Sequence, residues 1–343
     1  MKIIDEMKLD YEDVLIRPCP TELASRSEVN LEVSYITKHS KARFTGIPVC
    51  VANMDTVGTI NMAKVLYKEK IWVALHKFID SETLREFLST KESRYSFVSM
   101  GISDTEIERI KNLSYDTRSK PLVWNMPTDG ICNICIDAAN AYMYSFLDAV
   151  KIVREMFPNA IILAGNVCTP EGVDNVIKAG ADIVKCGTGS GEKCNTKQKT
   201  GVGYKQLSVA IECGQAANEL NALCCSDGGC KTPGDICKSL GAGSHLVMCA
   251  SLFSGTDECD SEWEEQDGIK YMKIYGMSSK IANDKYFGGL KSYRTSEGKE
   301  GWVKYKGSCL DVARDIKGSL ASCCTYTNTK NLENLYKNCV FTR

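Results

Sequence analysis

The sequence of 343 residues lacks a net charge of either sign, because 42 Lys+Arg balance 43 Asp+Glu and leave a formal charge of −1. This balance excludes a strongly basic protein that binds nucleic acids or membrane surfaces through its overall field. No run approaches the ~18 apolar residues that a membrane-spanning helix needs. The first residues, MKIIDEMKLDYED, lack the apolar segment of a signal peptide. We therefore expect a cytoplasmic protein with neither a nucleic-acid nor a membrane partner.

Low-complexity linkers and a visible domain boundary are also absent, whereas cysteine is abundant. The chain contains 18 Cys, and 43% of its residues are hydrophobic. Cysteines that are spread along a long chain without a secretion signal indicate reduced thiols rather than a disulfide framework. We expect most of them, such as Cys50, Cys135, Cys224 and Cys249, to be buried as small hydrophobic side chains. The composition predicts a large core; the length fits either two average domains or one large one, and the absence of a visible boundary favours one domain over residues 1–343.

One pattern repeats along the chain: a short apolar run, a polar or glycine-containing end, and then an amphipathic segment. Near-continuous apolar runs are typical of parallel strands that are buried on both faces. Eight such runs, each followed by a segment able to form a helix, predict an α/β fold closed into a (β/α)8 TIM barrel. An open doubly wound sheet is the alternative. The predicted strands are Val49–Met54, Ile71–His76, Tyr95–Gly101, Asn133–Ala139, Ala160–Asn166, Asp182–Gly187, Ala222–Asp227 and His245–Ser251.

Two segments between the predicted strands, Tyr142–Phe157 and Glu171–Ala179, have the character of helices, the first with apolar residues at helical spacing. The chain after Ser251 is mixed in character and punctuated by glycine. We expect it to form an extended C-terminal flap followed by a final helix. Because barrel enzymes place active-site flaps and phosphate sites after the eighth strand, this tail is a candidate part of the site.

The segment GTGSGEKCNT over residues 187–196 is the most informative strand end. Its alternating glycines allow the loop to bend, and Cys194 lies on it within reach of a substrate. A thiol becomes a nucleophile when a nearby positive charge lowers its pKa, and Lys193 and Lys197 are candidates for that charge. A flexible turn with an incidental cysteine is the alternative interpretation of this loop.

Motifs spread over nearly the whole chain resemble the IMP dehydrogenase/GMP reductase family. They include LDYEDVLIRP (9–18), ANMDTVGT (52–59), AGNV (164–167), KTGVGY (199–204), SDGG (226–229), YGMSS (275–279) and YRTSEGK (293–299). The YRTSEGK segment and the lack of an inserted regulatory module favour the reductase branch. The resemblance implies NADPH-dependent reductive deamination of GMP to IMP and ammonia through a covalent cysteine thioimidate. IMP dehydrogenase activity and a nucleotide-binding paralogue with weak or no turnover are the alternatives.

The resemblance also implies roles for individual residues and a homotetramer. Cys194 is the implied nucleophile, and Thr196 and Glu297 are the implied proton relay. The implied substrate contacts are Asp227, Gly228, Gly229, Ala250, Ser251, Gly276, Met277, Ser278, Arg294 and Gly298. The implied NADPH contacts are Ser25, Arg26, Lys77, Asp137, Ala138, Ala139, Tyr293, Ser322, Cys323, Cys324 and Thr325. A potassium-like ion is implied at Gly189, Gly191, Cys194 and Lys197.

Some positions depart from the family's pattern. Glu192 stands where the family usually has a serine that helps hold the 5′-phosphate, and a carboxylate there repels a phosphate unless it points away. Asn140–Ala141 replaces an expected asparagine-glycine pair, and Ala250–Ser251 replaces the reductase's double glycine. An insertion is expected around Tyr115–Gly130, before the fourth strand.

No transition-metal site is expected. Cys132–Cys135 forms an isolated C-x-x-C motif without a partner pair at zinc spacing. The three histidines are scattered along the chain, and His245 is expected in the core or at the edge of a strand.

Overall fold

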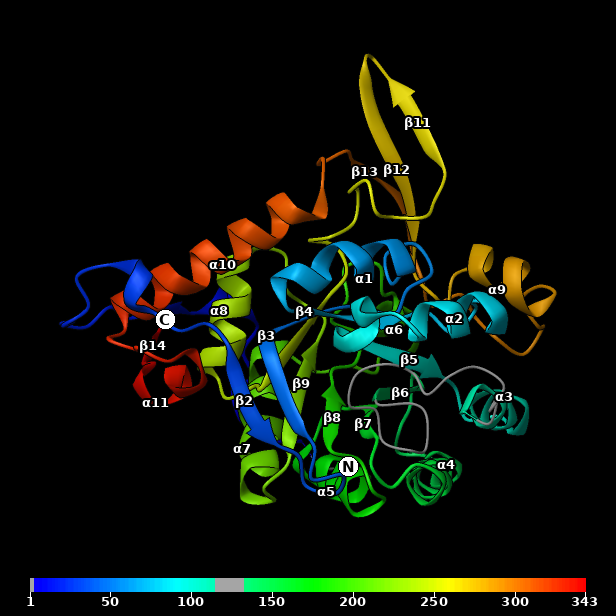
Figure 1. Ribbon diagram of the computed structural model, residues 1–343, viewed down its shortest axis with the longest axis horizontal. Coiled ribbons are helices and arrows are strands. Elements are labelled where there is room, and N and C mark those ends of the chain that lie inside the picture. Colours follow the sequence, from blue (N-terminus) through cyan, green and yellow to red (C-terminus); the bar gives the residue numbers. More distant parts are fainter. Residues whose placement is uncertain (1–2, 115–132) are drawn as a thin grey trace.

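The computed structural model describes residues 3–114 and 133–343, so the expected insertion at Tyr115–Gly130 lies outside the described residues. Eight parallel strands form a closed barrel, in which Val247 of the last strand pairs with Val49 of the first. The predicted (β/α)8 barrel is therefore confirmed, and the doubly wound alternative is wrong. The barrel strands (Figure 1) are β3 Arg43–Val51, β4 Ile71–Leu75, β5 Ser96–Met100, β6 Asn133–Asp137, β7 Ile161–Val167, β8 Ile183–Cys186, β9 Leu223–Asp227 and β10 Leu246–Cys249.

The interior of the barrel is filled with side chains. All five residues of β4 and all five of β5 are buried, which is why near-continuous apolar runs predicted them. The ring of Trp72 lies 4.4 Å from that of Phe44 and 4.9 Å from that of Phe97, measured between ring centroids. The barrel is thus a packed core rather than a pore, and a ligand has to bind outside its interior.

Most cysteines belong to the core, as predicted. Cys50, Cys135 and Cys224 are completely buried, and Cys249 is nearly so. Burial raises the pKa of Cys135 to about 12, and it raises the pKa of Cys50 as well. These thiols therefore stay protonated and pack as small hydrophobic side chains.

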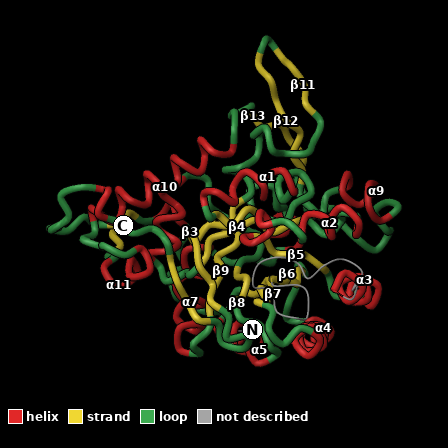
Figure 2. Tube along the Cα trace, in the orientation of Figure 1, coloured by secondary structure: helices red, strands yellow, loops and turns green. Residues whose placement is uncertain are grey.

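Helices cover the outside of the barrel (Figure 2), and both predicted helices are confirmed. Capping residues determine where several of them begin. Thr169 accepts a hydrogen bond from the Gly172 N–H, and Pro170 takes the first position of α5. The helices are α1 Ile60–Leu66, α2 Ser81–Leu88, α3 Asp104–Ser114, α4 Tyr144–Met156, α5 Pro170–Lys178, α6 Thr196–Thr200, α7 Gln206–Glu219, α8 Pro233–Gly241, α9 Lys280–Phe287, α10 Cys309–Tyr326 and α11 Leu335–Asn338.

The chain after the barrel builds more structure than the sequence predicted. A final helix was expected, and the structure instead has the long helix α10 followed by the short helix α11. Three antiparallel strands that we did not predict precede α10: β11 Trp263–Gln266, β12 Ile269–Tyr275 and β13 Glu300–Lys304. They project from the barrel in Figure 1. The pairing of Tyr275 with Glu300 brings the two ends of the intervening segment together. We call residues 288–299, between α9 and β13, the flap.

The two ends of the chain are joined by a short sheet. Strand β1 (Leu15–Ile16) pairs with β14 (Phe341–Thr342), and β2 (Val33–Ile36) extends β3 in the antiparallel direction. Among the described residues, no helix is both long enough and apolar enough to cross a membrane.

Candidate active site

The three predicted catalytic residues form one hydrogen-bonded line at the C-terminal end of the barrel. Cys194 lies on the loop after β8, Thr196 is the first residue of α6, and Glu297 belongs to the flap. The Cys194 thiol donates to Thr196 Oγ1 over 3.2 Å, and the Thr196 hydroxyl donates to Glu297 Oε2 over 2.7 Å. All three residues are half-buried. A thiol proton therefore has a continuous route to a carboxylate.

Main-chain pairing between the flap and the glycine loop holds this line together. The Asn195 N–H donates to the Glu297 carbonyl over 2.6 Å, and Cys194 pairs with Gly298 as in an antiparallel strand. A Cβ atom on Gly298 would lie 2.6 Å from the Ser279 nitrogen, so only glycine fits there. The glutamate thus reaches the threonine because the flap backbone is fixed beside the cysteine.

Asp227 ends strand β9 and faces the same end of the barrel. Its Oδ2 atom accepts hydrogen bonds from Asn166 over 2.8 Å and from the Lys185 ammonium over 3.2 Å. Gly228 and Gly229 follow with φ angles of 93° and 81°, a backbone conformation that favours glycine. A Cβ atom on Gly228 would lie 2.7 Å from Ser190 Oγ, so this turn contacts the glycine loop directly. The predicted nucleophile loop and the predicted ribose carboxylate are therefore neighbours.

Lys185 is a residue of the site that sequence reasoning missed. It is only 3% exposed and forms ion pairs with both Asp137 and Asp227, at the ends of β6 and β9. Burial disfavours charge on Asp137 and Lys185, yet their attraction prevails and holds the pKa of Asp137 below its usual value and that of Lys185 above it. One buried cation thus connects a predicted cofactor residue with a predicted substrate residue. In the sequence, the feature that could have indicated this role was a lysine within an otherwise apolar strand.

The predicted purine-contacting positions lie against the glycine loop. Gly276, directly after β12, is so close to Lys193 that a Cβ atom would lie 2.7 Å from its carbonyl oxygen, and the Ser278 carbonyl accepts from the Glu297 N–H over 3.2 Å. Met277 lies between these two. After β10, the carbonyl of Ser251 accepts from Lys306 Nζ over 2.7 Å. Gly276, Met277 and Ser278 therefore lie beside the loop that carries Cys194, whereas Ser251 is held against Lys306.

Glu192 points toward a cation rather than into free space. Its Oε1 atom lies 3.4 Å from the Lys193 ammonium, and its side chain is 44% exposed. Lys306 is also close enough for Glu192 to favour its charged form, although burial lowers the pKa of Lys306 overall. The unexpected carboxylate is thus accompanied by two positive charges that reduce its repulsion of an anion.

The predicted cofactor residues form two groups. Lys77, whose ammonium lies 3.2 Å from Glu106, and Asp137 belong to the ends of barrel strands, where Ala138 and Ala139 follow. Arg26, Ser322 and Cys323 instead line a cavity of about 790 Å³ beside α8 and α10, which neither Lys77 nor Asp137 lines. Ser25 caps the short 3-10 helix Arg26–Glu28 at this cavity, and Thr325 donates to the Ser322 carbonyl. Cys324 is completely buried, so its thiol faces the core.

Two predicted flap residues do not approach the cysteine. Tyr293 is 79% exposed, and the Arg294 guanidinium lies over the Tyr293 ring at 5.9 Å. Both point to solvent, whereas Glu297 and Gly298 on the same flap dock against the glycine loop. Tyr293 and Arg294 are therefore not part of the hydrogen-bonded line.

The predicted ion site consists of main-chain oxygens. The Gly191 carbonyl accepts from the Cys194 N–H over 3.0 Å, which leaves its second lone pair for a ligand. The stem of Lys197 covers Gly189, where a Cβ atom would lie 2.7 Å from Lys197 Cγ. In the part of the chain that the structure describes, no group of three His, Cys, Asp or Glu side chains is arranged to hold a metal. The donor set therefore suits a cation that accepts carbonyl oxygens.

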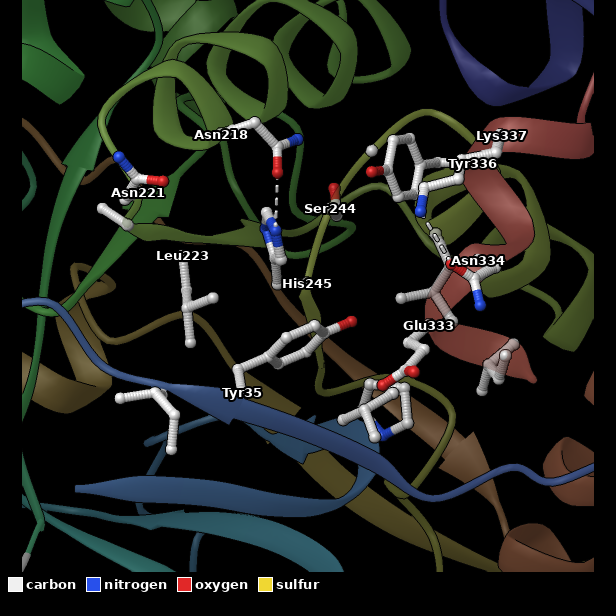
Figure 3. A pocket seen from close by; sticks show the side chains of 17 residues that line it. Tyr35, Asn218, Asn221, Leu223, Ser244, His245, Glu333, Asn334, Tyr336 and Lys337 are labelled. Atoms are coloured by element: carbon white, nitrogen blue, oxygen red, sulfur yellow. Dashed lines mark hydrogen bonds between the residues drawn. The ribbon is translucent and has the colours of Figure 1, made fainter. Parts of the chain in front are cut away.

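A second cavity, of about 410 Å³, lies at the N-terminal end of the barrel (Figure 3). His245 is 8% exposed there; it donates from Nε2 to Asn218 Oδ1 over 3.1 Å and accepts the Cys224 N–H at Nδ1. Both nitrogens of the ring are thus used within the protein. The prediction of a core histidine at a strand edge is confirmed, and this cavity is separate from Cys194.

These features define the class of protein: a (β/α)8 barrel whose site is built around a thiol joined through a hydroxyl to a carboxylate. A family model described as IMP dehydrogenase / GMP reductase domain matches residues 8–343, and the chain belongs to this family. It is 41% identical to GMP reductase of Onchocerca volvulus over 99% of this chain and 92% of the relative. It is 42% identical to GMP reductase 2 of Bos taurus (99% and 95%) and to GMP reductase of Yersinia pestis strain Pestoides F (100% and 96%).

Proposed function

We propose that this protein catalyses the NADPH-dependent reductive deamination of GMP to IMP and ammonia. The observation that supports this most strongly is the line Cys194–Thr196–Glu297, intact in a chain whose relatives named above are GMP reductases. Replacing an amine by hydrogen at C2 of a purine needs a nucleophile, a proton carrier and a source of hydride. The line supplies the first two.

Cys194 acts first, as the nucleophile. Its proton moves through the Thr196 hydroxyl to Glu297, and the sulfur then bonds to C2 of the purine. Glu297 returns the proton through Thr196 to the departing amine, so that the C2–N bond breaks and ammonia leaves. The carboxylate and the hydroxyl thus first accept the thiol proton and then deliver it to the amine.

NADPH supplies the hydride to C2 when it is bound. The positive charges of Arg26 and Lys77 suit its phosphates, and the Asp137 carboxylate suits ribose hydroxyls. Asp137 is held charged by Lys185, which also contacts Asp227 on the substrate side. After hydride transfer the C2–S bond would break, and the Cys194 thiolate would take up a proton from solvent, because its first proton left with the ammonia.

The substrate lies on the surface around the glycine loop. Asp227 accepts hydrogen bonds from the ribose hydroxyls, the backbone of Gly228 and Gly229 allows the nucleotide to approach closely, and Gly276 to Ser278 contact the purine. Ala250 and Ser251 lie at the phosphate end, and Lys193 draws Glu192 aside so that the phosphate can enter. Arg294 and Tyr293 approach the ligands only when the outer flap closes.

The separation of the cofactor residues into two groups agrees with the implied homotetramer. In such an assembly, Arg26 and Ser322 of one subunit can meet a cofactor held at Lys77 and Asp137 of the neighbouring subunit. The potassium-like ion at the Gly189 and Gly191 carbonyls, the single functional domain and the cytoplasmic location stay predictions.

The first test is turnover by the reduced, purified full chain. GMP with NADPH should give IMP, ammonia and oxidised cofactor in equal amounts, followed by absorbance and product chromatography. NADPH loss without IMP or ammonia would contradict the proposal. Formation of xanthosine monophosphate from IMP and NAD would instead favour the dehydrogenase, and calorimetric binding of GMP without turnover would favour the inactive paralogue.

A further inference from the structure

A pair of cysteines lies outside the site described above, where α8 packs against α10. Cys237 of α8 and Cys323 of α10 line the same cavity and interact with each other, and the Cys237 thiol donates to the Ser319 carbonyl oxygen over 3.8 Å. Ser319 and Cys323 are separated by one helical turn. Cys237 is therefore directed at the turn of α10 that ends with Cys323, and the two helices are in direct contact.

The pair is accessible from outside. Both thiols line the cavity of about 790 Å³ beside α8 and α10, whose wall also includes Arg26, Lys238 and Arg314. Cys323 is half-buried, whereas Cys237 is only 4% exposed. A small oxidant entering the cavity thus meets Cys323 first and finds Cys237 behind it.

The two thiols differ in chemical character. The neighbouring Cys237 thiol lowers the pKa of Cys323 although burial opposes this. The neighbouring Cys323 thiol, together with burial, raises the pKa of Cys237. Thiolate character, which governs attack on an oxidant, is therefore concentrated on the more exposed sulfur.

We propose that Cys323 and Cys237 are a modification site, at which a peroxide converts the two thiols to a reversible disulfide. The Cys323 thiolate attacks a peroxide oxygen, the O–O bond breaks, and a sulfenic acid forms with release of water. The Cys237 sulfur then attacks Cys323 Sγ, the S–S bond forms, and the sulfenic oxygen leaves as a second water. Two thiols lose two electrons and two protons to one hydrogen peroxide, and an added thiol reverses the change.

Peptide mapping by mass spectrometry tests the proposal on the full chain. After limited hydrogen peroxide, non-reducing digestion should yield a Cys237 peptide joined to a Cys323 peptide with the loss of two hydrogen atoms, and dithiothreitol should separate them. Cys237→Ser and Cys323→Ser should each abolish the joined species. Cys19→Ser, at an exposed thiol, should leave it unchanged.

A joined peptide from any other pair, or intact Cys237 and Cys323 thiols at a peroxide dose that oxidises Cys19, would overturn the proposal. Mapping of the unaltered chain decides this even where a variant fails to fold. A second expectation rests on the proposed function. Because Arg26 and Ser322 share the cavity, the disulfide should also raise the KM for NADPH. An unchanged KM in mapped, active protein would refute this link to the cofactor without touching GMP reduction itself.

Discussion

At the scale of single residues, Thr196 is the junction of the site. Its hydroxyl accepts from the Cys194 thiol and donates to Glu297, so one oxygen orients both groups. A hydroxyl of this kind is easily replaced by a methyl group of the same shape. A substitution can therefore remove the hydrogen bonds of Thr196 while keeping its packing.

Thr196→Val should lower kcat for GMP reduction by about 10²- to 10⁴-fold, because the proton route between thiol and carboxylate is cut. Thr196→Ser keeps the hydroxyl and should retain most of the activity. Stopped-flow measurement of NADPH consumption, with circular dichroism to check folding, distinguishes the two variants. Equal activities of Thr196→Val and the unaltered chain would show that no proton passes through this hydroxyl.

Residues differ in how far the sequence reveals them. The line Cys194–Thr196–Glu297 was predicted because its motifs are specific, although Glu297 is 101 positions from Thr196. Lys185 was not predicted, because a lysine in a strand gives no indication of which carboxylates surround it. Its partners, Asp137 and Asp227, come from other strands, and only closure of the barrel brings them together.

At the scale of elements, the barrel strands were predictable and the sheet beyond them was not. Buried parallel strands produce apolar runs that can be read locally. Strand β11, Trp-Glu-Glu-Gln, is largely exposed and charged, and it is held by pairing with β12 rather than by burial. This sheet nevertheless positions the site, because β12 and β13 anchor the segments on either side of the flap.

Gly298→Ala tests this positioning. The new methyl group would collide with main-chain atoms of Ser279 and Gly276, so the flap should leave the glycine loop and carry Glu297 away from Thr196. We expect at least a ~10-fold loss of kcat, the cost of displacing a group by about 1 Å being up to ~100-fold. Kinetics of the purified variant provide the measurement.

Gly318→Ala is the matched control, because a Cβ atom there meets nothing within 4 Å and the residue lies inside α10. Gly318 lines the cavity beside α8 and α10, so the comparison uses kcat at saturating NADPH, which should be unchanged, and the free energy of unfolding should rise by about 0.5–1 kcal/mol. Comparable losses of kcat in both variants would mean that glycine flexibility in general, rather than flap docking, explains the result.

At the scale of the whole molecule, the two ends of the barrel have different tasks. The C-terminal end holds the thiol line, whereas the N-terminal end holds the buried side chains of Asp182 and His245, which have hydrogen-bond partners within the protein. Asp182 is completely buried there and accepts from Arg154 over 2.7 Å and from the Ile162 N–H over 3.1 Å. His245 is buried at the same end, and it gives the fold a dependence on pH.

Burial lowers the pKa of His245 to about 4, against about 6.5 in an unfolded chain. Between these values the unfolded chain binds the proton and the folded chain does not, so stability falls as the pH falls from ~6.5 to ~4. Protonation of this one group should lower the free energy of unfolding by up to about 3 kcal/mol across this range. Urea unfolding at pH 7, 5.5 and 4.5 measures it, and His245→Gln should flatten the curve in this window. An equally steep curve in the variant would assign the loss of stability to other groups.

The central claim is that Cys194 bonds to C2 of GMP, and trapping that bond is its most direct test. The chain is mixed with GMP without NADPH, quenched in acid and digested for mass spectrometry. We predict that the Cys194 peptide gains the mass of GMP less one ammonia, and that Cys194→Ala shows neither this gain nor release of ammonia. Release of ammonia by Cys194→Ala, or a wild-type enzyme that turns over GMP with Cys194 always unmodified, would contradict the account.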